Sequence, residues 1–471
     1  MNVSTIAAIS TPGGQGGIGI IRLSGPRAID IALSVFRRHT PETMNAGLPS
    51  ACAPGFSPVN RYVYYGHIVD PADNRVLDEV LFFVMRSPHS YTAEDTAEIQ
   101  THASSMVMRS ILDLLVTAGA SLAEPGEFTK RAYLNGRIDL TQAEAVADLI
   151  FARSESALNT AMAHMSGQLK AVVSRLKHKL FDILVLMEAA IDFPDDVGDI
   201  ASPLDIADRL DNGILPDLDA LVKAHGEKKF LRHGLRVAII GGPNVGKSSL
   251  FNRLLDRDRA IVSEVPGTTR DFIEDSFVIQ GIPVVLTDTA DIRENSGTIE
   301  RAGIEKSWQT IAASDMVLYV VDAGLSVTSA DLEYFSRIQA QKIILVINKM
   351  DLPKADIRFT VPMEMNSIPC CRVSALQNFG LGMLKDLISN VAFASLPDRR
   401  HDIVPNLRQK QLLDKAKQAV TAAAGGLREN HLVELACIDL KTAMDALGEI
   451  TGDNIRHDVL NDIFSRFCIG K

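Results

Sequence analysis

The sequence has few cysteines, no recognisable signal sequence and no long apolar run, the features typical of secreted, metal-stabilised or membrane-bound proteins. Its 471 residues include five cysteines, none of them at C-x-x-C spacing, which argues against a zinc site or a disulfide framework. The N-terminus lacks a basic segment followed by an apolar one, and no apolar run reaches the length of a membrane span. We therefore expect a cytoplasmic protein without a membrane partner.

Positive charge is also scarce. The chain carries 48 lysines and arginines against 58 aspartates and glutamates, for a formal net charge of −10. This balance argues against a nucleic-acid binder that works through bulk positive charge, although it leaves room for a local basic patch. Apolar residues make up 46% and charged residues 23%, as in globular proteins with sizeable cores. The length indicates two to four domains.

A phosphate-binding loop is the clearest motif. The apolar run at 237–240 predicts a buried strand, and GGPNVGKS follows it, matching G-x-x-x-x-G-K-[ST] without a mismatch. Glycines let backbone N–H groups face phosphate oxygens, Lys247 would reach the β- and γ-phosphates, and the Ser248 hydroxyl would hold Mg²⁺. A chance glycine turn is the alternative, which the strand before and the helix after disfavour. The expected nucleotide contacts are Gly241, Asn244, Val245, Gly246, Lys247, Ser248 and Ser249.

Two further motifs indicate which base is bound. The predicted strand at 342–347 runs into NKMD, whose carboxylate can accept two hydrogen bonds from the edge of a guanine. The SAL triplet after 371–373 resembles the loop that backs the base with main-chain N–H groups. Each is weak alone, but in this order after a phosphate-binding loop they indicate GTP. The residues concerned are Asn348, Lys349, Met350, Asp351, Ser374, Ala375 and Leu376.

Two switch segments are expected between these motifs. AIVSEVPGTTRD, at 260–271, offers Thr268 and Thr269 as sources of a second hydroxyl for Mg²⁺, of which we expect Thr269 to be used. Asp288 follows a predicted strand at the place of a carboxylate that contacts Mg²⁺ through water. No glutamine follows Asp288 closely, so the negative charge at the γ-phosphate must be stabilised in a different way from that used by a Ras-like enzyme. The expected GTP contacts here are Ser263, Glu264, Val265, Pro266, Gly267, Thr268, Thr269, Asp288, Thr289, Ala290 and Asp291.

Periodicity divides the chain into domains. Residues 1–118 mix short apolar strands with helices and predict an α+β domain, whereas 119–230 and 397–471 are rich in alanine and leucine at helical spacing. Residues 231–396 carry the GTP motifs. We therefore predict an α/β Ras-like P-loop GTPase domain inserted in an all-α helical domain, with polar linkers near residues 230 and 400. A single helix is expected over 204–223.

Longer stretches resemble a known family over almost the whole chain. They are the opening IIRLSGP, the block EPGEFTKRAYLNGRIDLTQAEAVADLI, EAAIDFPDD, GGPNVGKSS, IVSEVPGTTRD, DTADIRENSGTIERAGIEKS and the terminal FCIGK. In these the chain resembles the MnmE (TrmE) family of tRNA-modifying GTPases. The resemblance implies a homodimer with an N-terminal folate-binding domain, a helical domain and an inserted Ras-like GTPase domain.

The same resemblance implies a reaction and a partner. The family works in a heterotetramer with a flavoprotein, MnmG (GidA), and the FAD is on that partner only. Together they add an aminomethyl or carboxymethylaminomethyl group to carbon 5 of the wobble uridine of certain tRNAs. The carbon comes from a tetrahydrofolate derivative (5,10-methylene or 5-formyl), and GTP hydrolysis drives the conformational cycle.

Catalytic roles also follow from the resemblance. A potassium ion, similar in role to an arginine finger, would be held by Asn244, Ser263, Val265 and Thr268, and Glu300 would orient water. From the residues alone, Asn244 is equally well a turn residue, and Glu300 an exposed carboxylate that opens a helix.

The family's folate site carries over to Arg22, Glu98, Arg137 and Lys471, whose carboxylate and cations suit a pterin with a glutamate tail. Without the resemblance, Arg22 and Glu98 would be ordinary charges on strands. Cys468 is a candidate functional thiol near that site; as a lone cysteine it is otherwise a small, partly buried hydrophobe.

Three positions depart from the family pattern. Asp291 replaces the glycine of DTAG and brings a carboxylate near the γ-phosphate, so we hypothesise a switch II that closes less readily. Arg137 stands where lysine is frequent, which preserves charge but not its geometry. QTHAS at 100–104 stands where glycines are preferred, and this affects the detail of the folate pocket.

We expect a potassium-activated GTPase, dependent on magnesium, that acts in tRNA modification. Two alternatives stay open at this point. One is a ribosome-assembly or translation GTPase without folate chemistry, which tetrahydrofolate binding would exclude. The other is a non-enzymatic scaffold with a vestigial GTPase, suggested by Asp291, which GTP turnover would exclude.

Overall fold

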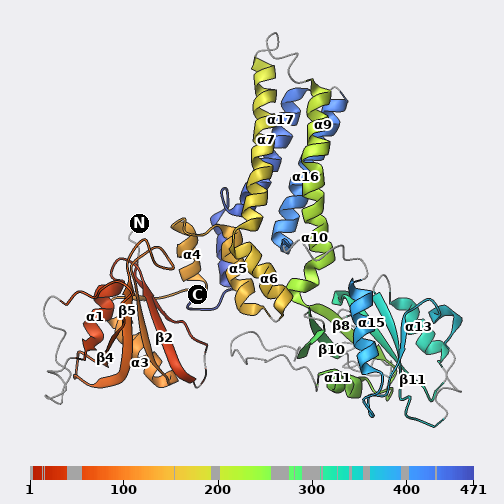
Figure 1. Ribbon diagram of the computed structural model, residues 1–471, viewed down its shortest axis with the longest axis horizontal. Helices are drawn as coiled ribbons and strands as arrows, with labels where there is room; N and C mark the ends of the chain where they lie inside the picture. Colours follow the sequence, from red (N-terminus) through yellow and green to blue (C-terminus); the bar gives the residue numbers. More distant parts are fainter. Residues whose placement is uncertain are drawn as a thin grey trace, which may run out of the picture.

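Three bodies make up the structure, a computed structural model. Figure 1 shows an N-terminal domain, an upright bundle of helices and an α/β domain. The N-terminal domain, the helical domain and the Ras-like fold agree with the predicted classes. The residues described are 4–12, 14, 16–39, 56–152, 154–192, 202–255, 275–279, 282–288, 308, 311–325, 327–338, 342–353, 361–393, 403–429 and 432–471.

The N-terminal domain is a sheet of seven described strands, in the order β3-β4-β5-β6-β2-β1-β7. Its strands alternate buried and exposed residues because one face packs on the two helices α1 and α3. The last strand, β7, pairs in parallel with β1, so the sheet extends beyond the boundary expected at residue 118. The elements are β1 Ile6–Ile9, β2 Gly16–Ser24, α1 Ala28–Val35, β3 Phe36–Arg38, β4 Tyr64–Val69, β5 Val76–Met85, β6 Thr96–Ala103, α3 Ser105–Thr117 and β7 Ser121–Leu122.

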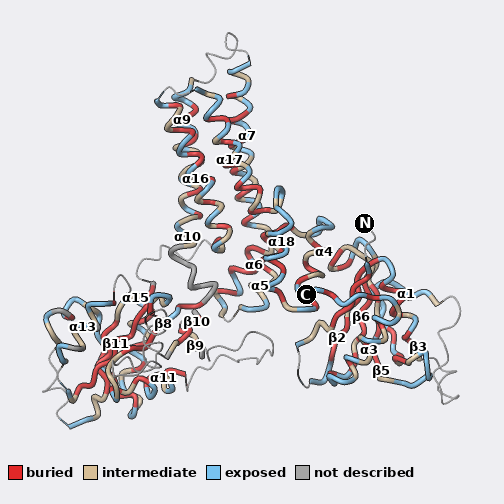
Figure 2. The backbone as a smooth tube through the Cα atoms, turned by 180° about the vertical axis from the view of Figure 1, so that it is seen from behind, coloured by how far each residue is buried: buried red, intermediate tan, exposed pale blue. Residues whose placement is uncertain are grey.

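The helical domain draws on both sides of the GTP motifs. One continuous apolar core joins α7, α9 and α10, which precede the α/β domain, to α16 and α17, which follow it. Figure 2 shows these helices with their buried sides turned toward one another. Its helices, and those that lead to it, are α4 Glu127–Leu134, α5 Leu140–Phe151, α6 Glu155–Met165, α7 Gln168–Asp192, α9 Pro203–Gly213, α10 Leu215–His233, α16 Leu407–Arg428, α17 Val433–Thr451 and α18 His457–Ser465.

Two sequence predictions about this region were wrong. The single helix expected over 204–223 is two helices, α9 and α10, broken at Ile214, whose φ of −126° and ψ of −50° are not helical. Pro216 explains the break, because proline suits the first turn of a new helix but not a helix interior. The linker expected near residue 230 is the last part of α10. Gly234, at φ 80°, ends that helix and passes directly into a strand.

The α/β domain is a sheet of six described strands, in the order β13-β12-β11-β8-β10-β9, all parallel except β9. β11, MVLYVVD, is buried along its whole length because apolar residues cover both faces of the sheet. Among the described residues, no helix is both long enough and apolar enough to cross a membrane. The elements are β8 Leu235–Gly241, α11 Lys247–Leu255, β9 Asp275–Ile279, β10 Ile282–Asp288, β11 Met316–Asp322, α13 Ser329–Arg337, β12 Lys342–Asn348, η1 Met363–Met365, β13 Cys370–Arg372 and α15 Leu381–Phe393.

Candidate functional site

The loop after β8 requires its glycines. Gly241 has a φ of 152°, and a Cβ atom there would lie 2.2 Å from the carbonyl oxygen of Val320. Gly246 has a φ of 95°, and its Cβ would lie 2.4 Å from Nδ2 of Asn348. Asn244, at φ 60°, is exposed and takes a left-handed conformation that asparagine tolerates better than most residues. The backbone is thus curled as a phosphate-binding loop requires.

Lys247 and the serines after it begin helix α11. Nζ of Lys247 donates to the carbonyl oxygens of Gly241, at 3.2 Å, and Gly242, at 2.9 Å, so this largely buried lysine lies across the loop. Ser248 and Ser249 are exposed in the first turn of α11. N–H groups at a helix start carry partial positive charge, and together with the lysine they suit an anion such as a phosphate.

Asn348, at the end of β12, joins the two nucleotide loops. Its Nδ2 donates to the carbonyl oxygen of Val245, at 2.9 Å, and its Oδ1 accepts from the N–H of Ala375, at 3.1 Å. The side chain is 2% exposed, so both bonds are shielded from water. The first residue of NKMD therefore holds the phosphate-binding loop and the SAL loop in one arrangement.

The rest of NKMD is fixed by neighbouring strand ends. Lys349, at φ 65°, lies with Nζ 2.7 Å from Oδ2 of Asp322, at the end of β11. Oδ1 of Asp351 accepts from the Ser374 hydroxyl at 2.5 Å, and that hydroxyl accepts from the N–H of Gln377 at 3.1 Å. These bonds orient the carboxylate that would face a guanine. Parallel strands place such groups together because their carboxyl ends meet at one edge of the sheet.

Sequence reasoning missed two contributors to this site. Arg253, on α11, donates to the carbonyl oxygens of Ala375, at 3.1 Å, and Leu376, at 3.2 Å, and so fastens the SAL loop to the helix that follows the phosphate-binding loop. Nothing in its sequence context indicates that contact. Asp322 could have been found from the sequence, since it is a carboxylate at the end of a buried apolar strand.

Several predicted residues lie outside the described part of the chain. Asp288 is the last residue of β10, in register with Ile239 of β8, and only its backbone is described. Met350 is described and donates its N–H to the Val373 carbonyl oxygen at 3.2 Å. The predicted residues outside the described ranges are Ser263, Glu264, Val265, Pro266, Gly267, Thr268, Thr269, Thr289, Ala290, Asp291 and Glu300.

The second candidate site lies on the N-terminal sheet. Arg22 of β2 and Glu98 of β6 are directly opposite in the strand register, and Nε of Arg22 lies 2.7 Å from Oε1 of Glu98. The Arg22 guanidinium also lies over the rings of Tyr91, at 5.9 Å, and Phe128, at 5.8 Å. Arg137 approaches the same Tyr91 ring at 5.0 Å. The structure thus brings two of the four predicted folate residues, Arg22 and Arg137, to one aromatic ring, and a third, Glu98, to Arg22.

Tyr91 is held from several sides. Its hydroxyl is 2.9 Å from that of Thr129, and its carbonyl oxygen accepts from Nη1 of Arg137 at 2.8 Å. Burial raises the pKa of the Tyr91 hydroxyl, against the opposing effects of the Thr129 bond and of Arg137 and Arg22. The phenol therefore stays neutral at physiological pH, and two guanidinium groups lie over its ring.

The terminal segment returns to this sheet. The N–H of Gly126 donates to the carbonyl oxygen of Cys468 at 3.3 Å, and a Cβ on Gly470 would lie 2.4 Å from the carbonyl oxygen of Ile9. Lys471 and Cys468 are half-buried. Close by, the Ser10 hydroxyl is buried and has no hydrogen-bond partner among the described residues. This is a polar atom that a bound molecule could satisfy.

The first arrangement defines the class of protein. A phosphate-binding loop, an NKMD segment and a SAL loop, joined through Asn348 at one edge of a mostly parallel sheet, form the nucleotide site of a P-loop GTPase.

Comparison with known proteins narrows the class to a family. Residues 140–468 match the family model of the MnmE helical domain, and 5–137 match that of the GTP-binding protein TrmE N-terminus. The chain belongs to the MnmE family of tRNA modification GTPases. A relative from Syntrophus aciditrophicus, named tRNA modification GTPase MnmE, is 42% identical over 99% of both chains. One of that name from Carboxydothermus hydrogenoformans is 40% identical over 100% of both.

One solved structure is similar to part of this chain. Aquifex aeolicus Era bound to GDP.AlF4- is similar with a TM-score of 0.28 and 26% identity, covering 39% of this chain and 66% of that one. The family assignment rests on the full-length relatives.

Proposed function

We propose that this chain couples GTP hydrolysis to modification of carbon 5 of the wobble uridine in certain tRNAs. The observation that carries the nucleotide part is the pair of hydrogen bonds through which Asn348 joins the phosphate-binding loop to the SAL loop. The tRNA part rests on membership of the MnmE family.

The nucleotide site divides its work among side chains. Lys247 binds the β- and γ-phosphates, the Asp351 carboxylate selects guanine, and Glu300 orients the attacking water. Mg²⁺ and K⁺, when bound, offset the negative charge that develops on the phosphates. The exposed Ser248 hydroxyl in the first turn of α11 and the exposed Asn244 fit this use. The Mg²⁺ residues would be Ser248 and Thr269, and the K⁺ residues Asn244, Ser263, Val265 and Thr268.

The N-terminal site would take the one-carbon donor, a tetrahydrofolate derivative. Glu98 accepts from the donor groups of the pterin, and Arg22, Arg137 and Lys471 offset the carboxylates of the glutamate tail. The unsatisfied Ser10 hydroxyl near the terminal segment supports a polar ligand there. Arg22 already pairs with Glu98, so the carboxylate is held in place before a ligand arrives.

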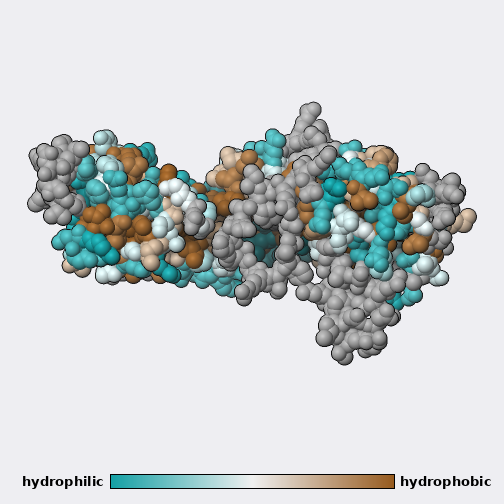
Figure 3. Space-filling model, turned by 90° about the horizontal axis from the view of Figure 1, so that it is seen from below, coloured by the Kyte–Doolittle hydropathy of each residue, from teal (hydrophilic) through white to brown (hydrophobic). Residues whose placement is uncertain are grey.

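The assembly would be a homodimer, and a heterotetramer with the FAD-carrying flavoprotein MnmG (GidA). Exposed apolar side chains on the N-terminal sheet, on the face away from α1 and α3, support the proposal of a dimer. Tyr65 and Leu81 are opposite each other on this face and remain 45% and 40% exposed. Figure 3 shows apolar side chains on the surface of this end of the molecule. Such a surface is what a second copy would bury. In the cycle, switch I would become ordered when GTP and K⁺ are bound, and the GTPase domains of the dimer would then meet.

GTP hydrolysis by the purified chain in K⁺ and Na⁺ buffers of equal ionic strength tests this function. We expect strong stimulation by K⁺ that disappears in Glu300→Ala. Nucleoside analysis of tRNA from cells whose only copy is the wild-type or the Glu300→Ala chain should show the modified uridine with the first alone. Equal rates in both salts would reject potassium activation. Normal tRNA modification without tetrahydrofolate binding would reject the folate site.

A further inference from the structure

The chain enters and leaves the α/β domain through two segments that contact each other. Helix α10 leads into β8, and the segment described from Ile403 leads into α16. Nδ1 of His225, on α10, lies 2.7 Å from the carbonyl oxygen of Pro405. The adjacent Val404 is buried, so the exit segment is held in the protein interior rather than free in solvent. A displacement of the α/β domain on one segment is therefore shared by the other.

The next residue, Asn406, caps the N-terminus of α16 through a reciprocal pair of hydrogen bonds with Gln409. The Asn406 side chain accepts from the N–H of Gln409 at 2.8 Å, and the Gln409 side chain accepts from the N–H of Asn406 at 2.9 Å. Gln409 is fully buried, and its Nε2 donates to Oε2 of Glu144, on α5, at 2.6 Å. The capping residue of α16 is thus one side chain away from α5.

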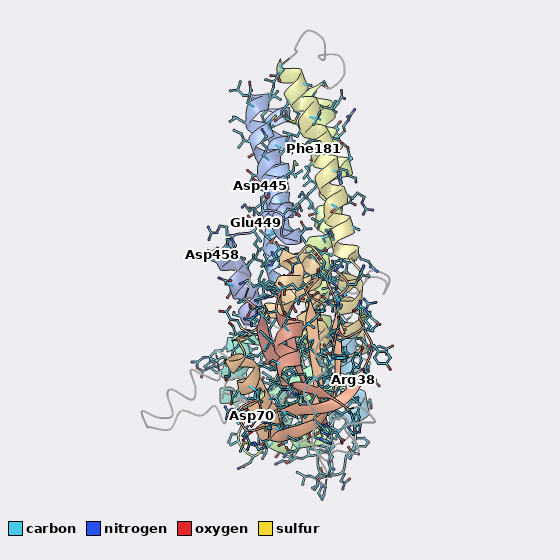
Figure 4. The ribbon with its side chains drawn as sticks, turned by 90° about the vertical axis from the view of Figure 1, so that its left-hand side faces the viewer. Arg38, Asp70, Phe181, Asp445, Glu449 and Asp458 are labelled. Carbon is cyan, nitrogen blue, oxygen red and sulfur yellow. The ribbon has the colours of Figure 1, made fainter. Side chains whose placement is uncertain are left out.

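Arg408 makes a second connection at the same place. Its Nε and Nη2 donate to the two carboxylate oxygens of Glu144 at 2.8 and 2.9 Å, and its Nη1 donates to the carbonyl oxygen of Glu449, on α17, at 3.0 Å. Figure 4 shows Glu449 on the lower part of α17, below Asp445. Glu144 is 8% exposed. A buried carboxylate tolerates poorly the loss of its partners, which favours two discrete arrangements over a gradual shift.

Helix α5 continues this path to the N-terminal site. Asp139 caps α5 by accepting from the N–H groups of Thr141, at 2.8 Å, and Gln142, at 3.1 Å. Two residues earlier, Arg137 contacts Tyr91 through its guanidinium and its hydrogen bond. A rotation or shift of α5 would therefore move Arg137 relative to the Arg22–Glu98 pair.

We propose that Glu144, Arg408 and Gln409 form a relay that passes the nucleotide state of the α/β domain to α5 and, through it, to the N-terminal site. They are positioning residues and touch neither nucleotide nor the candidate folate pocket. The inference rests on the proposed function, because a relay has a purpose only if hydrolysis at one site serves chemistry at the other.

Hydrogen exchange of the full chain tests the relay. In the wild type, replacing GDP by a non-hydrolysable GTP analogue should change amide exchange in α11, in α5 and around Tyr91. In Glu144→Gln, the change in α5 and around Tyr91 should shrink by about tenfold, a coupling of ordinary size. The change in α11 and the rate of GTP hydrolysis should stay within about twofold. The matched control is Glu188→Gln, which removes an exposed ion pair with Lys441 between two helices of the same domain.

The outcomes separate the relay from the proposed function. A wild-type response at α5 in Glu144→Gln, or an equal loss in Glu188→Gln, overturns the relay alone. A wild type whose α5 never responds to nucleotide overturns the coupled function as well. If Glu144→Gln does not melt cooperatively, Arg408→Lys makes the same test, since lysine keeps the charge without the two-pronged contact. In Glu144→Gln/Arg408→Gln the loss should equal that of the single variant, because both residues act through one pair.

Discussion

The α/β domain and the N-terminal domain assemble their polar sites in opposite ways. The nucleotide site uses short contiguous motifs, each at the carboxyl end of a strand in one mostly parallel sheet. The N-terminal site takes Arg22 and Glu98 from antiparallel neighbours and Arg137 from beyond α4, and Lys471 is predicted to join them. The first site is complete within one domain. The second, if Lys471 belongs to it, also needs a segment from the far side of the α/β domain in sequence.

This difference predicts which changes stay local. A parallel sheet collects its strand ends at one edge whatever the rest of the chain does, so the nucleotide site should tolerate damage elsewhere. The N-terminal site depends on strand register and on a distant segment. It should therefore be sensitive to changes that leave GTP binding intact.

The largest expected effect is at the phosphate-binding loop. Lys247→Ala removes the cation that lies across the loop, so GTP hydrolysis should fall by about a thousandfold. Tetrahydrofolate binding should be unchanged. Turnover and calorimetric binding measure the two effects, and Lys342→Ala, in the same domain, is the matched control. Loss of folate binding in Lys247→Ala would contradict the idea that the two sites respond independently to local changes.

Asn348→Ala tests whether the nucleotide loops are held as one unit. It leaves the Val245 carbonyl and the Ala375 N–H without their buried partner, which costs about 1–3 kcal/mol of stability in that region. We expect GTP affinity to fall by about 10- to 100-fold. Nucleotide titration measures the affinity and thermal unfolding the stability. Normal affinity in a stable variant would contradict the bridging role of Asn348.

Glu98→Gln addresses the N-terminal site. Hydrogen bonds to a charged group contribute about 1.5–3 kcal/mol, so tetrahydrofolate affinity should fall by about 10- to 100-fold while GTP turnover holds. Isothermal titration of the full-length chain measures it. Glu79→Gln, an exposed glutamate on the same sheet, should bind as the wild type does. Equal affinity in both variants would remove Glu98 from the site.

Asp291→Gly should raise GTP turnover. Replacing the carboxylate removes about 1 kcal/mol of repulsion from the γ-phosphate for charges near 4 Å apart in water, or about fivefold in rate. Single-turnover hydrolysis measures this step directly. Turnover that does not rise would contradict the idea that switch II is slowed by this residue.

The smallest expected effect concerns pH and the N-terminal sheet alone. The hydrogen bond to Asp78 raises the pKa of His102, so the folded state favours the charged imidazole. That stabilisation is present below the unfolded pKa of about 6.5 and is lost as pH rises through the higher folded pKa. His102→Gln should therefore lower the unfolding temperature near pH 5 and leave it unchanged near pH 9. His89→Gln, an exposed histidine of the same domain, is the control; an equal loss at both pH values would contradict the linkage.

Local chemistry explains what could be predicted from the sequence. Gly241, Gly246 and Lys247 are where their motif required them, because loop conformation and residue type are set within a few positions. The break at Ile214 was missed because alanine and leucine spacing outweighed a single proline. Arg253 could not be found, since its contact with Ala375 depends on how α11 packs rather than on its neighbours in sequence. The potassium residues in the switch segments and Glu300 stay predictions.

The tight fit of Gly470 against Ile9 has a consequence for synthesis on the ribosome. Strand β1 emerges long before the segment that covers it, and Gly126 likewise emerges long before Cys468, to which it donates a hydrogen bond. At ordinary translation rates roughly 20–90 s separate the synthesis of Ile9 from that of Gly470. During that interval the end of β1 is open to other partners, such as a chaperone or another nascent chain. Truncating or extending the last few residues should therefore impair the yield of native protein before it alters any catalytic step.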